Sequence, residues 1–230
     1  MLPLAILAGG LATRMRPLTE KIPKSLLEVA GTPFVFHQLR LLQRQGIDDV
    51  VLCVGYLGEM IEERVGNGES FGLHVRYSYD GPRLLGTAGA LKQALPLLGC
   101  AFFVLYGDSY LTCDYNAVQT TYEKSGKSAL MTIYRNQGLY DSSNVVFEQG
   151  SIIYYDKKNK RPDMLYIDYG LGILQSGVLE IIPDGESADL ADIYRELVLT
   201  GMLAGYEAPE RFYEIGSSSG LAELEAMLLY

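Results

Sequence analysis

The segment that decides the fold reads Leu7-Ala8-Gly9-Gly10-Leu11-Ala12-Thr13-Arg14-Met15-Arg16-Pro17-Leu18-Thr19, and it continues an apolar run that begins at Ala5. The apolar run predicts a first strand, and the two glycines predict a turn at its end. Glycines let backbone N–H groups approach phosphate oxygens, while Arg14 and Arg16 add charged donors. These residues alone favour a nucleotide-phosphate loop. The alternative is a surface turn whose arginines pair with carboxylates.

Lys24 follows the loop and would bring a third cation to the same strand end if the loop folds back. The glycine spacing fits neither the dinucleotide-binding fingerprint nor the Walker phosphate loop, which disfavours both of those sites. The loop is therefore of another kind, although its glycines and cations suit the same ligand chemistry.

Outward from this loop, strand-like and helix-like windows alternate through the first half of the chain. Apolar runs over 49–54 and 101–106 predict buried strands of a parallel sheet. Thr32 as N-cap and Pro33 in the first turn predict the start of a helix that ends at Gly46. Further helices are expected at about 58–65, 87–95 and 116–124. The alternation predicts a doubly wound α/β fold.

Beyond about residue 125 the pattern becomes richer in strands. Strands are expected over 129–134, 144–147, 151–155, 166–174 and 211–215, with a hairpin turn at Gln149-Gly150. A helix is expected over 188–200, and Leu221, Leu224 and Leu228 give a C-terminal helix an apolar face. Because no linker rich in Gly, Ser or Pro separates the parts, we expect one domain over 1–230 with halves at about 1–125 and 126–230.

Composition excludes several classes of protein. Nineteen Lys plus Arg stand against 28 Asp plus Glu, a net charge of −9, which argues against a nucleic-acid partner or an anionic membrane. The first apolar run is too short for a membrane span and follows no basic residue, so we expect a cytoplasmic protein without a signal peptide. Cys53, Cys100 and Cys113 match no zinc or disulfide pattern and are expected to be small core residues.

Several ordered motifs resemble those of sugar-phosphate nucleotidylyltransferases. They are Gly9-Gly10-x-x-Thr13-Arg14-Met15-x-Pro17-Leu18-Thr19, Pro23-Lys24-Ser25-Leu26, Leu85-Gly86-Thr87-Ala88-Gly89, Tyr106-Gly107-Asp108 and Tyr213-Glu214-Ile215-Gly216. The resemblance implies a Rossmann-like (GT-A-type) mixed sheet covered by helices, with a small β-rich extension. It also implies that residues 1–125 bind a nucleoside triphosphate and residues 126–230 a sugar 1-phosphate, which the enzyme joins with release of pyrophosphate.

The resemblance assigns roles to individual residues. It implies catalytic roles for Arg14, Lys24 and Asp108, and nucleotide binding by Leu7, Ala8, Gly9, Gly10, Thr13, Arg14, Gly86, Thr87 and Ala88. Asp108, Lys157 and Asp168 are expected at the sugar phosphate. Asp108 and Glu214 are expected to bind Mg²⁺, an ion that prefers one or two protein carboxylates together with phosphate oxygens and water.

Some positions depart from the family pattern or match it loosely. Glu214 stands where many relatives have aspartate, and Ala12 where most have glycine. Asp156-Lys157 is similar to the acidic residue plus lysine that relatives use at the sugar-phosphate site, and Asp80 lies where relatives carry a loop over the nucleotide. Neither of the two histidines has a metal partner at useful spacing, so general-base histidine chemistry is not expected.

Three other functions stay open on the sequence. One is a metal-dependent glycosyltransferase, which the cations of the loop disfavour because they suit a triphosphate better than a diphosphate sugar. The others are a non-catalytic subunit that senses a nucleotide or sugar phosphate, and cytidylyl transfer to phosphocholine. The nucleotide base is open, with GTP as a first guess, and so are the sugar and the oligomeric state, with a homo-oligomer among the alternatives.

Overall fold

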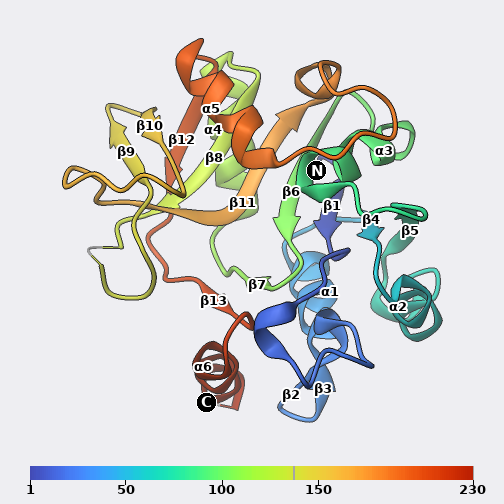
Figure 1. Cartoon of the computed structure of the whole chain (residues 1–230). Coiled ribbons are helices and arrows are strands. Elements are labelled where there is room, and N and C mark those ends of the chain that lie inside the picture. Colours follow the sequence, from blue (N-terminus) through green and yellow to red (C-terminus); the bar gives the residue numbers. More distant parts are fainter. Residues whose placement is uncertain (137, 230) are drawn as a thin grey trace.

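The computed structural model describes residues 1–136 and 138–229 and is built around a nine-stranded mixed sheet (Figure 1). The strand order across the sheet is β5-β4-β1-β6-β11-β8-β12-β10-β9. The strands are β1 Leu4–Leu7, β4 Asp49–Val54, β5 His74–Tyr79, β6 Ala101–Tyr106, β8 Ala129–Tyr134, β9 Val145–Glu148, β10 Ser151–Tyr155, β11 Ile167–Gln175 and β12 Leu203–Glu207. The first four neighbours are parallel, and β11 is antiparallel to both β6 and β8. The predicted α/β mixed sheet is confirmed.

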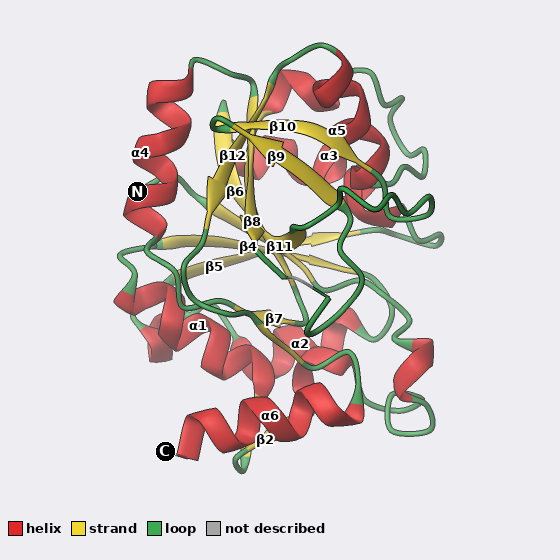
Figure 2. Cartoon of the chain, turned by 90° about the vertical axis from the view of Figure 1, so that its left-hand side faces the viewer, coloured by secondary structure: helices red, strands yellow, loops and turns green. Residues whose placement is uncertain are grey.

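Helices cover both faces of this sheet. α1 (Phe34–Arg44), α2 (Gly58–Val65) and α4 (Tyr115–Ser125) pack on one face, and α3 (Gly86–Leu98) and α5 (Leu190–Leu199) on the other. Figure 2 shows α3 and α5 above the sheet and α1 and α2 below it. Because side chains alternate along a strand, Leu4 and Ile6 pack toward α1 while Ala5 packs toward α3.

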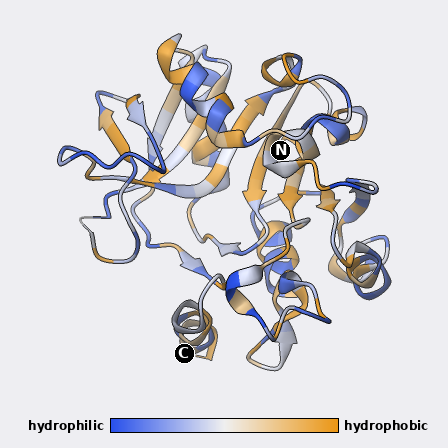
Figure 3. Ribbon diagram, viewed as in Figure 1, coloured by the Kyte–Doolittle hydropathy of each residue, from blue (hydrophilic) through white to orange (hydrophobic). Residues whose placement is uncertain are grey.

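The central strands are apolar on both faces, as their orange colour in Figure 3 shows for β1, β4 and β6. Leu4, Ile6 and Leu52 are fully buried. Burial of each such side chain contributes about 1.5–3 kcal/mol, so these short strands supply a large part of the driving force for folding. Within the described residues, no helix has both the length and the apolar character that crossing a membrane requires.

The position of β1 creates a crevice at one edge of the sheet. β1 pairs in parallel with β4 on one side and with β6 on the other. The connection from β1 to β4 passes through α1, on one face, whereas the chain reaches β6 through α3, on the opposite face. Such a switch in strand order opens a crevice outside the carboxyl ends of the two strands, where doubly wound proteins bind ligands.

Two small sheets lie below the main one. β2 (Glu28–Val29) pairs with β3 (Thr32–Pro33), and β7 (Ser109–Tyr110) pairs with β13 (Tyr213–Glu214). The last helix, α6 (Ser218–Leu229), follows β13 and packs beneath α1 through a cluster that includes Phe34, Ile215 and Leu224. The β7–β13 pair thus joins the late part of the chain to the residues directly after β6.

Most predicted elements are confirmed, but Thr32 and Pro33 precede the predicted helix, which begins at Phe34 with Pro33 as its N-cap. They form β3, because Ala30 and Gly31 both have positive φ (49° and 70°) and close a two-residue hairpin. Gly46, with φ 81°, follows the end of the helix as expected. The predicted hairpin at Gln149-Gly150 is confirmed, since it joins β9 to β10 with positive φ at both residues.

Two smaller predictions are corrected, and one strand lies where none was predicted. β12 was not expected, and it lies inside the sheet beside β8. Cys100 is exposed, whereas Cys53 and Cys113 are buried as predicted. Of the apolar face expected on α6, Leu224 is buried, and Leu221 and Leu228 are only partly buried at the edge of the same cluster.

Candidate active site

A first cavity, of about 260 Å³, lies at the carboxyl ends of β1 and β6. Six of the residues predicted to bind nucleotide line it, namely Leu7, Ala8, Gly9, Gly10, Gly86 and Thr87. Lys24 and Asp108, predicted as catalytic, line it as well. The structure therefore brings the strand-end loop, the start of α3 and the end of β6 into one site.

Close packing of backbone shapes the floor of the first cavity. The N–H of Ala8 donates to the carbonyl of Cys53 at 2.8 Å, and the N–H of Gly107 donates to the carbonyl of Leu7 at 3.0 Å. A Cβ atom on Gly107 would lie 2.4 Å from that carbonyl oxygen, and one on Gly9 would lie 3.1 Å from the nitrogen of Gly55. Glycine is required at Gly107 because no side chain fits between the two strand ends.

In the loop after Gly10, Ala12 has a backbone conformation that glycine adopts more easily than alanine. Ala12 has a left-handed backbone, with φ 47° and ψ 41°, ahead of a 3₁₀ turn at Thr13–Met15. The hydroxyl of Thr19 donates to the carbonyl of Ala12 at 2.8 Å and ties the loop across its own base. Alanine is therefore accepted here in a conformation that disfavours it by about 1–2 kcal/mol.

The predicted residues of this loop do not all face the first cavity. Arg14 is exposed and lines a second cavity instead, while Thr13 is exposed. Ala88 is buried in α3, and its N–H donates to the carbonyl of Ala188 at 2.9 Å. Arg16, the second arginine of the loop, is exposed and lines neither cavity.

The Gly86-Thr87-Ala88-Gly89 motif also has a packing role that the sequence did not reveal. A Cβ atom on Gly86 would lie 2.6 Å from the carbonyl oxygen of Ala188. The hydroxyl of Thr87 accepts the N–H of Leu190 at 2.7 Å, at the start of α5. The motif thus attaches α5 to the rim of the first cavity, in addition to lining it.

Lys24 and Asp108 meet at the inner end of the first cavity. Lys24 begins a 3₁₀ turn at Lys24–Leu26, and its Nζ lies 2.7 Å from Oδ2 of Asp108. Their side chains are 16% and 31% exposed, so the pair remains accessible to a ligand. The predicted return of Lys24 to the strand end is confirmed by this contact.

The second cavity, of about 780 Å³, opens on the other side of Asp108 toward β10, β11 and the start of α6. Tyr106 and Asp108 line both cavities. Lys157, Asp168 and Glu214, which were predicted at the sugar phosphate and the metal, line the second cavity together with Arg14. The two cavities therefore meet at the residues that end β6.

A polar network centred on Asp168 forms one wall of the second cavity. Its Oδ2 accepts hydrogen bonds from the hydroxyls of Tyr155 (3.2 Å) and Tyr106 (3.5 Å), and Lys157 Nζ lies 3.4 Å away. Its Oδ1 accepts the N–H of Gly170 at 3.1 Å. The Asp168 side chain is 5% exposed, so it is better placed to hold Lys157 than to meet a ligand directly.

Burial sets the protonation of several groups at the site. Burial, reinforced by the charge of Asp168, raises the pKa of Tyr106 and of Tyr155, so both phenols stay protonated and act as donors. Burial raises the pKa of the Cys53 thiol to about 12, which excludes it as a thiolate nucleophile near neutral pH. Burial also raises the pKa of Asp80, whose carboxylate lines the first cavity.

Sequence reasoning missed the two phenols and the turn contacts of Asp156. Tyr106 and Tyr155 lie in apolar strand runs, where a tyrosine reads as core, and no spacing signal links them to Asp168. The Asp156 carboxylate accepts the N–H groups of Lys158 (2.7 Å) and Asn159 (2.9 Å) and so stabilises the turn that carries Lys157. Asp156 is a turn residue here, although the motif resembles a ligand pair.

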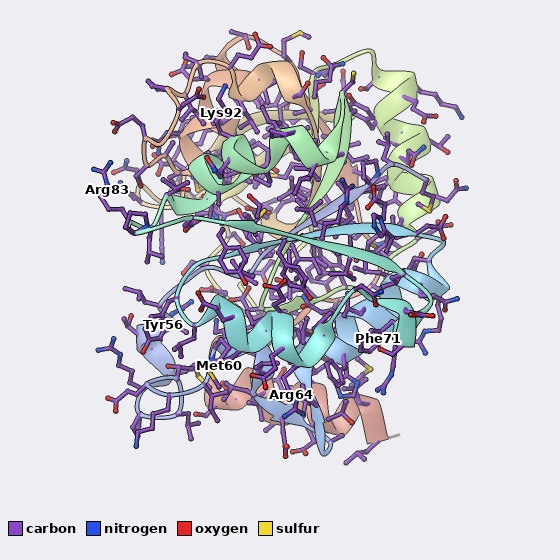
Figure 4. All side chains as sticks on the ribbon, turned by 90° about the vertical axis from the view of Figure 1, so that its right-hand side faces the viewer. Tyr56, Met60, Arg64, Phe71, Arg83 and Lys92 are labelled. Atoms are coloured by element: carbon purple, nitrogen blue, oxygen red, sulfur yellow. The ribbon has the colours of Figure 1, made fainter. Side chains whose placement is uncertain are left out.

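Asp80 lies where a covering loop was expected. The segment from Gly81 to Leu84 is exposed, and Figure 4 shows Arg83 projecting from the edge of the molecule on the same side as Tyr56. Asp80 and Leu84 line the first cavity, and Oδ2 of Asp80 accepts the N–H of Leu85 at 3.1 Å. Asp80 before this segment and Leu84 at its end therefore form part of the wall of the first cavity.

The carboxylates of Asp108 and Glu214 provide a donor set that fits Mg²⁺. Pairing of β7 with β13 sets Glu214 opposite Ser109, and the N–H of Ile215 donates to the carbonyl of Asp108 at 3.0 Å. No group of three or more His, Cys, Asp and Glu that could hold a metal occurs among residues 1–136 and 138–229. Two carboxylates completed by phosphate oxygens and water are the arrangement that Mg²⁺ prefers.

Glu214 is also bound to its own loop. Its Oε1 accepts the hydroxyl of Ser217 at 2.8 Å, and its Oε2 accepts the N–H of Gly216. Each carboxylate oxygen has two lone pairs, so these bonds orient Glu214 without exhausting its capacity as a ligand. The contacts with Gly216 and Ser217 thus fix the direction in which the Glu214 carboxylate points.

Comparison with known proteins agrees with this geometry. The family model described as nucleotidyl transferase matches residues 4–229. A UTP–glucose-1-phosphate uridylyltransferase from Synechocystis is 32% identical over 86% of this chain and 55% of its own length. An N-acetylmuramate alpha-1-phosphate uridylyltransferase from Neisseria meningitidis is 30% identical over 96% of each chain. This chain therefore spans about half of the first relative and nearly all of the second.

The fold is also shared with solved structures. A protein assigned as a glucose-1-phosphate thymidylyltransferase from Bacillus anthracis superposes with a TM-score of 0.86, covering 99% of this chain and 95% of that one at 22% identity. That likeness concerns the fold, whereas the family model and the curated relatives cover the sequence motifs that line both cavities. The resemblance seen in the sequence is confirmed: the chain belongs to the nucleotidyl transferase family.

Proposed function

We propose that this protein transfers a nucleoside monophosphate from a nucleoside triphosphate to a sugar 1-phosphate and releases pyrophosphate. The observation that carries the proposal is the shared wall between the cavities, because Asp108 lines both and is paired with Lys24 at 2.7 Å. A triphosphate in the first cavity and a sugar phosphate in the second would meet at this point. Family membership supports the same reaction.

The reaction needs alignment and charge neutralisation, and no protein nucleophile. An oxygen of the sugar phosphate attacks the α-phosphorus, a new P–O bond forms, and the bond from the α-phosphorus to the bridging oxygen breaks as pyrophosphate leaves with the electron pair. Held in place, the two substrates react as if within one molecule. Lys24 and Arg14 neutralise charge on the phosphates, and Lys157 holds the sugar phosphate.

We propose Mg²⁺ as the cofactor, held by Asp108 and Glu214. When bound, the ion would offset negative charge on the phosphate oxygens around the reacting phosphorus. Lys24 then has two tasks: it balances Asp108 before substrates bind and donates to phosphate oxygens afterwards. Asp168 and the phenol of Tyr106 keep Lys157 directed into the second cavity.

The base and the sugar are the finer part of the proposal. GTP is the first guess from the sequence, and both relatives described above are uridylyltransferases, so GTP and UTP come first in the test. N-acetylmuramate 1-phosphate and glucose 1-phosphate are the first acceptors, because they are named for those relatives. The predicted cytoplasmic location, the homo-oligomer and the lack of nucleic-acid and membrane partners stay predictions.

The test is pyrophosphate release with Mg²⁺ across GTP, UTP, CTP, dTTP and ATP, each with several sugar 1-phosphates and with phosphocholine. Asp108→Asn should lower the rate of the active pair by about 1,000-fold, because it removes charge that stabilises the phosphates during transfer. Asp114→Asn is the matched control, since Asp114 is the N-cap of α4, where its side chain accepts the N–H of Ala117 at 3.0 Å.

The control variant should keep both its stability and its activity, because asparagine caps a helix N-terminus about as well as aspartate. Activity with phosphocholine alone would replace the sugar by a different acceptor, and sugar transfer from a nucleotide-sugar would point to a glycosyltransferase. Nucleotide binding without turnover across the whole panel would leave a sensing subunit. Full activity in the absence of divalent metal would refute the assignment of Mg²⁺.

A further inference from the structure

Gln38 lies outside every motif described above, yet its side chain reaches the residues that end β6. It is on α1 and is 1% exposed. Its Nε2 donates to the carbonyl of Ser109 at 2.8 Å and to the carbonyl of Tyr106 at 3.2 Å. These two carbonyls flank Gly107-Asp108, so one side-chain nitrogen spans the segment that carries the shared carboxylate.

The orientation of this amide is fixed by its partners. A carbonyl oxygen accepts hydrogen bonds and cannot donate them, so only the NH₂ group of Gln38 can satisfy two backbone carbonyls. Its Oε1 is buried and has no hydrogen-bond partner among the described residues. A buried acceptor without a partner is unfavourable, and an apolar side chain of similar shape would avoid that cost. The glutamine therefore serves this position through its two donors.

The segment from Tyr106 to Ser109 is held from three directions. β1 holds it through the bond from the N–H of Gly107 to the carbonyl of Leu7. β13 holds it through the bond from the N–H of Ile215 to the carbonyl of Asp108. Gln38 holds its two ends from α1, below the sheet. Asp108 is thereby fixed at the point where Lys24 meets it and where the two cavities join.

We propose that Gln38 is a positioning residue for the transfer reaction, acting through Asp108. By binding the carbonyls on either side as a clamp, Gln38 fixes the position of the Asp108 carboxylate between the two cavities. The metal ion that Asp108 would hold then stays aligned with the phosphates of the substrates. The inference rests on the proposed function for the reaction itself. The clamp, however, also predicts effects on metal binding and backbone protection that do not depend on turnover.

The test is Gln38→Met, which keeps the length and volume of the side chain and removes both donors. Gln45→Met is the matched control, because Gln45 makes the same number of backbone hydrogen bonds at the end of the same helix. Its Nε2 donates to the carbonyl of Cys113 at 3.0 Å, and its Oε1 accepts the N–H of Tyr115 at 3.3 Å. These contacts flank Asp114 and lie away from both cavities.

Gln38→Met is expected to lower kcat by about 10- to 100-fold, since small misplacement of a reacting group has effects of that size. KM for the nucleotide should change by less than about threefold, because the first cavity keeps its other walls. Mn²⁺ affinity, followed by electron paramagnetic resonance, should fall, and amide hydrogens of 106–109 should exchange faster. Gln45→Met should show none of these changes, although both variants lose stability.

Equal effects of the two variants on kcat, Mn²⁺ affinity and exchange would overturn the proposal, because a general loss of stability would then explain them. If Gln38→Met does not fold, Gln38→Asn against Gln45→Asn repeats the comparison, since the shorter amide can reach at most one of the two carbonyls. If the wild-type protein shows no transfer, the proposed function fails. The Mn²⁺ and exchange measurements still decide the clamp.

Discussion

The two cavities that meet at Asp108 are built in different ways. The first is formed largely by backbone and small residues at the ends of β1 and β6, where Gly107 packs directly on the carbonyl of Leu7. The second is formed by a network of long side chains from separate strands, centred on Asp168 and Lys157. The shape of the first cavity therefore depends on the absence of side chains at its glycines, and the shape of the second depends on the side chains that reach into it.

This difference matches the ligands proposed for each cavity. Phosphate groups are common to all nucleoside triphosphates and can be bound by N–H groups of a glycine-rich loop. Sugars differ from one another in the placement of hydroxyl groups and substituents, which side chains can discriminate. The first cavity should therefore tolerate few substitutions of its glycines. In the second cavity, a few substitutions of side chains should be enough to change which sugar 1-phosphate is accepted.

The largest effect is expected from a substitution that disrupts the backbone packing of the first cavity. Gly107→Ala places a Cβ atom 2.4 Å from the carbonyl oxygen of Leu7, a distance that forces β1 and β6 apart. We expect a loss of about 1–3 kcal/mol in stability, as for other overpacked sites, and at least a tenfold loss of nucleotide affinity. Thermal unfolding and calorimetric titration with the active nucleotide measure the two effects.

Gly177→Ala is the control for that substitution, because nothing lies within 4 Å of the Cβ it would add and its φ is not positive. It should leave nucleotide affinity unchanged. Unaltered nucleotide binding in Gly107→Ala would mean that the cavity adapts by a shift of the strand ends, and the contrast drawn between the two cavities would fail.

An intermediate effect is expected from a substitution in the second cavity. Lys157→Met removes the cation beside Asp168 and should raise KM for the sugar phosphate by about 10- to 100-fold, the effect of losing a charge-assisted contact. Nucleotide affinity should stay within about twofold, since Lys157 lines only the second cavity. Steady-state kinetics with each substrate varied in turn measures both values.

Lys127→Met provides a lysine control outside the cavities, where Nζ donates to the hydroxyl of Ser151 at 3.0 Å and to the carbonyl of Leu203 at 3.2 Å. It should alter neither KM. If Lys157→Met weakened nucleotide binding as much as sugar-phosphate binding, the two cavities would have to be treated as a single site.

The smallest effect concerns the turn beside Lys157. The N–H of Asn159, its side-chain amide and the N–H of Lys158 lower the pKa of Asp156 from its ordinary value of 3.8 to about 2. A lowered pKa in the folded state means that the charged carboxylate stabilises the fold above pH 4, and that this contribution is lost as the pH falls toward 2. Asp156→Asn lacks it at every pH.

The difference in Tm between the wild-type protein and Asp156→Asn should therefore shrink as the pH is lowered from 6 toward 2, as followed by circular dichroism. Asp184→Asn, which removes a carboxylate that is 96% exposed, controls for the change in net charge. A constant difference in Tm across the pH range would show that the turn does not depend on the ionised carboxylate.

The same contrast explains what the sequence could predict. The strand ends of the first cavity follow apolar runs and glycines that are contiguous in the chain, so β4, β6 and the loop after β1 were identified from the sequence alone. The return of Lys24 to the strand end was also expected from the sequence, whereas its pairing with Asp108 after β6 came only from the structure.

The rest depended on contacts between distant segments. β12 was missed because Gly205 interrupts its strand pattern, yet glycine is needed there: a Cβ atom would lie 2.5 Å from the ring of Phe147. Ala88 was expected at the nucleotide because it lies in a binding motif, whereas the helix turns it into the core. The phenols around Asp168 come from β6 and β10, and no local pattern connects them.

The pairing of β7 with β13 joins a short C-terminal segment to the rest of the protein. All strands of the nine-stranded sheet end by Glu207, whereas Glu214 and α6 follow an exposed connector at Pro209-Glu210. A protease cut in that connector would leave the sheet covalently whole, and Glu214 would stay attached to it through β13, through packing and through the hydrogen bond from the N–H of Ala30 to Glu225. The contacts of β13 and α6 therefore hold the C-terminal segment, and Glu214 with it, against the residues that follow β6.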